Sequence, residues 1–152
     1  MAASNSEEEK TVIGYFVIRQ KLPSLNDVVL ANRKNKYVGS KMKKEIQQGI
    51  VLEIESARRV RKTISPVEAP VEIFIEWHEK TKKRDGDNVQ SSAKFILDAL
   101  QEAGILRGDS RRYVKQVHHM IFDDKIDCVI VMICPADGEE EKRWKKNFWK
   151  KS

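Results

Sequence analysis

The sequence predicts a single α+β domain with a mixed sheet and helices mainly on one face. Strand-like apolar stretches alternate with segments of helical periodicity, in the order βαβαββ. The chain has 152 residues, which is enough for one hydrophobic core. It shows neither an internal repeat nor a boundary that would separate a second domain.

The first half is expected to supply one strand and one or two helices. Residues 11–19 are apolar at both odd and even positions, which predicts a strand, and Pro23-Ser24 breaks it. A helix or two should occupy parts of residues 36–58. Pro66 and Pro70 bracket the link to the second half.

The second half is expected to contain three strands and one helix. Residues 71–78 alternate between apolar and other side chains, which predicts a strand. A helix is predicted over residues 88–103, with Gly104 as its C′ residue. Its apolar face is formed by Val89, Ala93, Ile96, Leu100 and Ala103. Strands are predicted over residues 112–122 and 126–134.

Composition indicates a reduced, intracellular protein. The first ten residues lack a signal pattern and are expected to be disordered, and no apolar run approaches the ~20 residues of a membrane helix. Cys128 and Cys134 lie on one predicted strand, about 20 Å apart, which is too far for a disulfide. The domain is expected to span residues 11–134 and a basic tail residues 135–152. In the tail, Trp144 and Phe148 can anchor a short helix, pack on a partner subunit or, less favourably, stack on unpaired bases.

The net charge of +6 is concentrated in two stretches. One lies between residues 33 and 62, and the other is the tail. Such patches suit phosphate backbones, although a solvated helix face explains many lysine runs. The residues of the first stretch taken as candidate nucleic-acid contacts are Lys41, Lys43, Lys44, Arg58, Arg59 and Arg61.

The chemical signal of the chain is a set of carboxylates around the predicted 88–103 helix. Asp85 and Asp87 precede it, Asp109 follows it, and Lys94 lies on the side of the helix that faces Asp87. Carboxylates are the ligands that Mg²⁺ prefers. Acidic residues gathered within a basic protein point to metal-dependent chemistry on a nucleic-acid backbone.

This order of residues resembles the RusA family of Holliday junction resolvases, common in phages and prophages. That family has Asp-x-Asp-Asn, a lysine, an apolar helix with Asp-Ala-Leu, a glycine and a closing acidic pair. The matching residues are Asp85, Asp87, Asn88, Lys94, the run 95–100, Gly104 and Asp109. The resemblance covers roughly residues 70–134.

The resemblance implies a Mg²⁺-dependent endodeoxyribonuclease of DNA recombination and repair. Its metal ligands would be Asp85, Asp87 and Asp109, and Lys94 would be catalytic. It further implies a four-way DNA junction as substrate, a homodimer, and a bacterial or phage-encoded protein in the host cytoplasm. No membrane partner is expected, because the chain has no long apolar run.

Other interpretations of these residues stay open. Asp87 or Asn88 can simply cap the helix, Lys94 can pair with Asp98, and Asp109 can belong to a turn. Two departures from the family, Gly86 and Gly108, favour a non-catalytic DNA-binding module that has kept the fold. A nuclease for flaps or other branched intermediates is a third alternative.

Two smaller groups of polar residues compete with this site. Asp123, Asp124 and Asp127 form an acidic cluster, in which a hairpin turn between the last two strands best explains Asp123 and Asp124. His118 and His119 are adjacent in a predicted strand and should point to opposite faces, which disfavours binding of one metal by both. His78 is either a residue that supports the metal ligands or a surface histidine.

Overall fold

A computed structural model describes residues 11–68, 70–80 and 89–136. These residues form one small α+β domain with a four-stranded mixed sheet, which confirms the predicted fold class. The predicted disordered segment, residues 1–10, and most of the predicted tail, residues 137–152, lie outside the described residues.

All four predicted strands are present, with ends that differ by three residues or fewer. They are β1 (Gly14–Ile18), β2 (Val71–Glu79), β3 (Val114–Asp123) and β4 (Cys128–Pro135). Their order across the sheet is β1-β4-β2-β3. Strand β4 runs antiparallel to β1 and β2, whereas β2 and β3 are parallel. A parallel pair requires a crossover connection, and here this connection contains a helix.

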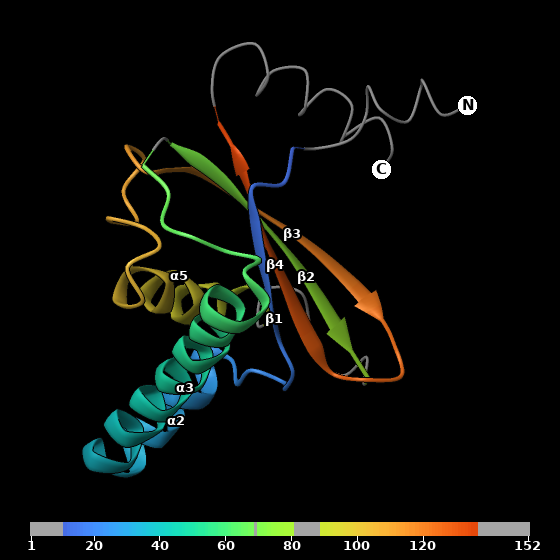
Figure 1. The fold of residues 1–152 in the computed structure, drawn as a ribbon. Helices are drawn as coiled ribbons and strands as arrows, with labels where there is room; N and C mark the ends of the chain where they lie inside the picture. Colours follow the sequence, from blue (N-terminus) through green and yellow to red (C-terminus); the bar gives the residue numbers. More distant parts are fainter. Residues whose placement is uncertain (1–10, 69, 81–88, 137–152) are drawn as a thin grey trace.

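The helices cover one face of the sheet (Figure 1). They are α2 (Leu25–Lys34), α3 (Lys36–Ser56) and α5 (Ala93–Glu102), and α3 continues into a π-helical turn, η1 (Ala57–Arg61). Helix α3 packs against both α2 and α5. None of the helices in the described part of the chain is long and apolar enough to cross a membrane.

Helix α2 was not predicted, although the sequence contains a signal for it. Ser24 and Asp27 form a capping box. The Ser24 hydroxyl accepts the Asp27 backbone N–H at 3.2 Å, and the Asp27 carboxylate accepts the Ser24 N–H at 2.8 Å. Helical structure before β2 therefore begins at Leu25 rather than near residue 36, and two helices separate β1 from β2.

Helix α5 is shorter than the predicted 88–103 helix. Ser91 and Ser92 form a turn before it, and the Ser92 hydroxyl donates to the Pro23 carbonyl at 2.7 Å. Serine side chains compete with helical hydrogen bonds in this way. The predicted stop is correct: Gly104 has φ +77°, and Ile105 N–H reaches the Leu100 carbonyl at 2.9 Å in a Schellman closure.

The core lies between the sheet and the helices. Alternate residues of β2 and β4 face it, together with the apolar sides of α3 and α5. Trp77 and Phe95 are fully buried there, and burial of such side chains stabilises the fold by about 1.5–3 kcal/mol each. The opposite face of the sheet carries a smaller apolar cluster of Phe74, Met132 and Cys134.

Candidate functional site

The first two predicted metal ligands lie outside the described residues. Asp85 and Asp87 belong to the connection 81–88, which joins β2 to the segment before α5. The predicted helix cap at Asp87 or Asn88 lies there too. Their roles stay predictions.

Lys94 lies in the first turn of α5, with its side chain 57% exposed. Its Nζ is 3.6 Å from Oδ1 of Asp98, one turn further along the helix. The pair considered as an alternative is therefore formed in this structure. Because Lys94 is largely exposed, an i,i+4 pair of this kind contributes only a few tenths of a kcal/mol. Lys94 can exchange Asp98 for another anion at little cost.

Asp109 is exposed in the connection between α5 and β3. The preceding residue, Gly108, packs under the ring of Tyr113, where an added Cβ would lie 3.0 Å from Cδ2. A second acidic residue at position 108 would therefore require the Tyr113 ring to shift. The packing gives a local reason why Asp109 stands without an acidic neighbour here.

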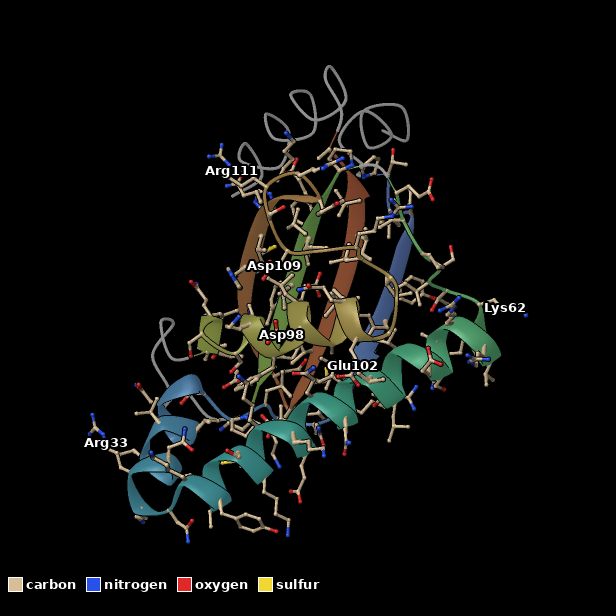
Figure 2. The ribbon with its side chains drawn as sticks, turned by 90° about the vertical axis from the view of Figure 1, so that its left-hand side faces the viewer. Arg33, Lys62, Asp98, Glu102, Asp109 and Arg111 are labelled. Atoms are coloured by element: carbon tan, nitrogen blue, oxygen red, sulfur yellow. The ribbon has the colours of Figure 1, made fainter. Side chains whose placement is uncertain are left out.

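The topology sets a condition on any shared metal site. Because β2 and β3 are parallel, the end of β2 at Glu79 and the start of β3 at Val114 lie at opposite ends of the sheet. Figure 2 shows Asp98 and Asp109 on the helix-covered side of the molecule. Convergence of Asp85, Asp87 and Asp109 therefore requires the connections flanking α5 to extend along the helix toward each other.

Magnesium stays a prediction for this site. Among the described residues no group of three or more His, Cys, Asp or Glu side chains is arranged to hold a metal ion. Two of the three predicted ligands fall outside that set. Asp109 fits the role chemically, because a magnesium ligand has to be an accessible oxygen donor.

The basic residues between positions 33 and 62 form two clusters rather than one surface. The first is near the start of α3, and the second is in η1. From Lys44 to Arg58 the helix rises about 20 Å. Two members are already paired, Lys41 with Glu45 at 4.0 Å and Arg59 with Glu55 at 2.9 Å.

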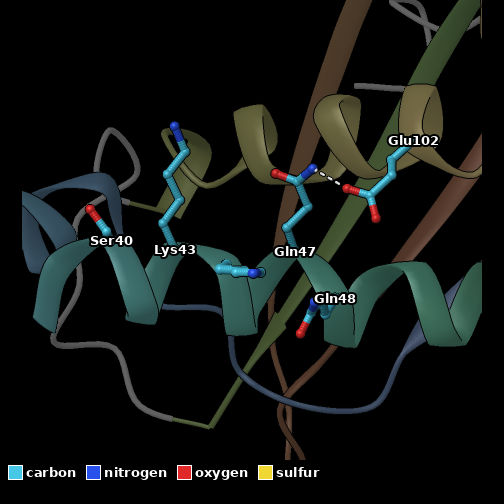
Figure 3. A pocket seen from close by; sticks show the side chains of 6 residues that line it. Ser40, Lys43, Gln47, Gln48 and Glu102 are labelled. Carbon is cyan, nitrogen blue, oxygen red and sulfur yellow. Dashed lines mark hydrogen bonds between the residues drawn. The ribbon is translucent and has the colours of Figure 1, made fainter. Parts of the chain in front are cut away.

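The first cluster borders a hollow of about 360 Å³ between α3 and α5. Lys43 and Gln47 extend from α3 toward α5, and Gln47 Nε2 donates to Glu102 at 2.8 Å (Figure 3). Lys44 also lines this hollow. Two ammonium groups beside a single carboxylate leave the hollow able to accept an anion.

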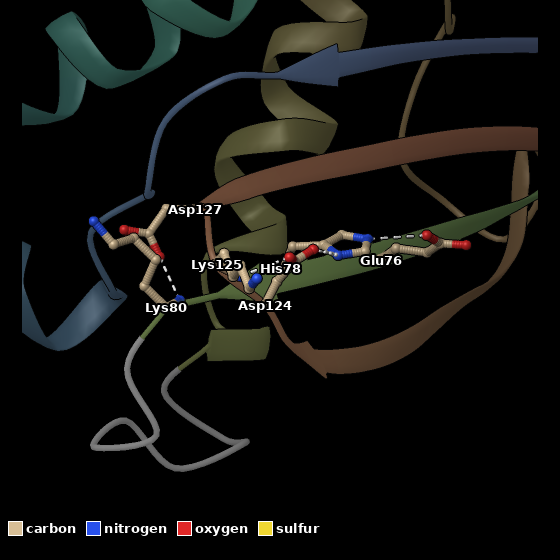
Figure 4. A network of polar contacts seen from close by, with 6 residues as sticks. All are labelled: Glu76, His78, Lys80, Asp124, Lys125 and Asp127. Atoms are coloured by element: carbon tan, nitrogen blue, oxygen red, sulfur yellow. Dashed lines mark hydrogen bonds and ion pairs between the residues drawn. The ribbon is translucent and has the colours of Figure 1, made fainter.

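His78 is held in a polar network at the end of β2. Its Nδ1 lies 2.8 Å from Asp124 and its Nε2 3.1 Å from Glu76 (Figure 4). A backbone hydrogen bond from Lys125, helped by His78, lowers the pKa of Asp124. Asp123 ends β3 and Asp124 follows it, at the predicted turn between β3 and β4. His78 therefore contacts the β3–β4 hairpin and Glu76 rather than Asp109.

A buried pair on the second face of the sheet was missed by sequence reasoning. Glu72 and His118 are both buried and share a hydrogen bond, and the His118 ring stacks on Phe74 at 4.1 Å. The alternation in β2 placed Glu72 beside Phe74. The pairing itself depends on the parallel β2–β3 register, which the sequence does not specify.

Comparison with known proteins supplies no family. No protein-family model matches the chain, and no curated protein matches it. Its function has to be inferred from its own residues and their arrangement.

Proposed function

We propose that this chain is a Mg²⁺-dependent endodeoxyribonuclease that cuts Holliday junctions or related branched DNA. The observation that carries the proposal is the ordered set of Asp85, Asp87, Lys94 and Asp109 around α5. The described members support it, because Lys94 and Asp109 are both exposed to solvent.

Each residue of the set has a role in phosphodiester hydrolysis. Asp85, Asp87 and Asp109 would hold one or two Mg²⁺ ions. Bound Mg²⁺ would supply an activated water and neutralise charge on the scissile phosphate. Lys94 would donate its ammonium N–H groups to a phosphate oxygen that becomes more negative in the transition state.

The surface around α5 favours a polyanionic substrate. Lys43 and Lys44 border the hollow between α3 and α5, so cations are available beside the helix that carries Lys94. Binding would then depend steeply on salt, because each neutralised phosphate releases counterions. A four-way junction offers two equivalent strands, and a two-fold homodimer would present two sites to them.

The decisive experiment is cleavage of a fixed four-way junction with Mg²⁺ or with Ca²⁺, by the wild type and by Asp87→Asn. We expect the wild type to cut only with Mg²⁺. Asp87→Asn should not cut, yet should bind the junction as well or better, because it removes a negative charge near phosphate. Asp123→Asn, an exposed acid at the end of β3, is the matched control and should cut normally.

The same assay decides between the proposal and its alternatives. Cleavage of flaps but not of four-way junctions would replace the proposed substrate and retain the proposed metal-dependent hydrolysis. Salt-sensitive binding without cleavage would favour a non-catalytic DNA-binding module. The tight packing of Gly108 on Tyr113 is compatible with that role. Wild-type cleavage by Asp87→Asn would remove Asp87 from the site.

A further inference from the structure

A second cationic site lies at the C-terminal end of η1. Figure 2 shows Lys62 at one end of the helical layer and Arg33 at the other. Helix α3 passes directly into the π-helical turn η1, and Lys62 caps this turn with its N–H bonded to the Ala57 carbonyl. The backbone then turns toward β1, where the Tyr15 N–H donates to the Thr63 carbonyl at 2.9 Å.

Lys62 has an unusual backbone conformation. Its φ of 59° and ψ of 38° are left-handed, and it is the one non-glycine residue with positive φ in the described part of the chain. Glycine adopts this conformation freely, whereas a Cβ crowds the following carbonyl. Strained residues and π-helical turns both gather at functional sites. Lys62 combines both features, which motivates a functional interpretation of its side chain.

The surroundings of Lys62 are suited to an anion. A hollow of about 390 Å³ is lined by Ile13, Arg58, Lys62, Thr63, Ile64, Ser65 and Pro66. These residues include two cations and no carboxylate. The Ser65 hydroxyl adds a polar group, while the Thr63 hydroxyl donates to the Tyr15 carbonyl at 2.8 Å. One guanidinium nitrogen of Arg58 donates to the Ala103 carbonyl at 3.2 Å, which fixes the group at the end of α5. A guanidinium has five N–H donors, so Arg58 has further donors for a second acceptor.

We propose that this hollow binds a backbone phosphate of DNA, with Lys62 as its main contact and Arg58 beside it. The choice of DNA rests on the proposed function, while the anion site rests on the geometry alone. The hollow lies at the far end of α3 from Lys43 and Lys44. A duplex arm that touches both clusters would follow the length of the helix.

The test compares wild type with Lys62→Gly in binding of a labelled four-way junction without divalent metal, over a series of salt concentrations. We expect weaker binding and a salt slope smaller by about one. We also expect the melting temperature to rise by about 2 °C, because glycine relieves the left-handed strain. Together, higher stability and weaker binding exclude simple unfolding as the cause.

Two variants control for charge. Lys62→Arg should keep most of the binding without the gain in stability. Lys115→Gln removes an exposed charge on β3 and should leave the salt slope nearly unchanged. Unchanged binding by Lys62→Gly, or a lower melting temperature, would overturn the proposal even if the wild type cuts junctions.

A second measurement separates the site from the nuclease. Inorganic phosphate and a short single-stranded oligonucleotide are titrated while the amide NMR signals of Thr63 and Ser65 are followed. Shifts with the oligonucleotide that disappear in Lys62→Gly support the site whether or not the chain cuts DNA. Shifts with inorganic phosphate but not with the oligonucleotide would make this a site for the free ion and overturn the DNA contact. If neither ligand shifts these signals, the anion site is overturned, and the proposed nuclease activity is then tested by the cleavage assay alone.

Discussion

The indole N–H of Trp77 donates a hydrogen bond to Nδ1 of His119 at 3.0 Å, across the parallel β2–β3 pair. Trp77 is fully buried, and its N–H can only donate. His119 must therefore leave Nδ1 unprotonated and carry its proton on Nε2. The neighbouring His118 points to the other face, where it meets Glu72, as the predicted strand required.

The burial of His119 predicts a stability that falls in mild acid. Burial, and to a smaller degree the charge of His118, lower the pKa of His119 in the folded protein. A depressed pKa means that the unfolded state binds the proton more readily. The contribution is therefore full above the unfolded pKa of about 6.5 and is lost as pH falls through the lower folded value.

The measurement is the urea midpoint of wild type and His119→Gln at pH 7.5 and at pH 5. We expect the wild type to lose more stability on acidification than the variant, in which the titrating group is absent. In Trp77→Phe the His119 pKa, followed by NMR, should move up toward its ordinary value. Equal acid sensitivity of wild type and His119→Gln would contradict the assignment.

Lys94→Ala is expected to lower the cleavage rate by about 10²-fold or more, because it removes a cation from a transition state that gains negative charge. The free energy of unfolding should change by only tenths of a kcal/mol, since the Lys94 side chain is largely exposed. Single-turnover cleavage at saturating Mg²⁺ and a urea titration measure the two effects.

Asp98→Asn is the matched control for that prediction, because it breaks the same ion pair and leaves Lys94 in place. Lys94→Arg should restore activity only in part, since a planar guanidinium does not replace a compact ammonium. If Lys94→Ala cuts at the wild-type rate, Lys94 is only the partner of Asp98.

Charge reversal of Lys41, Lys43 and Lys44 to Glu should weaken junction binding and flatten its dependence on salt. A variant of equal net charge provides the control, in which three exposed lysines outside the helices are reversed, Lys80, Lys115 and Lys125. Fluorescence anisotropy at several salt concentrations distinguishes them. Equal loss in both variants would indicate a general charge effect rather than a contact surface at α3.

Gly39→Ala should destabilise the α2–α3 hairpin. A Cβ at residue 39 would lie 1.7 Å from Oδ1 and 2.9 Å from the backbone Cα of Asn32. Movement of the Asn32 side chain cannot relieve the second contact, so the helices must separate, at a cost of about 1–3 kcal/mol. Gly49→Ala is the control, because its nearest contact is at 3.4 Å and alanine favours helix. A wild-type urea midpoint for Gly39→Ala would refute the close contact.

Local sequence determined much of this protein. The alternation in β2, the helical spacing on α5 and the stop at Gly104 are set by neighbouring residues, so periodicity and turn chemistry identified them. The order of Asp85, Asp87, Lys94 and Asp109 is likewise a property of the sequence, and so is the chemistry that it suggests.

Only the tertiary structure decided how distant segments meet. The start of α5 at Ala93 depends on a hydrogen bond from Ser92 to Pro23. The buried Glu72–His118 pair and the Trp77–His119 bond depend on which strands are neighbours and in what register. Sequence patterns report the faces of single elements, whereas these contacts arise from the relative positions of elements far apart in the chain.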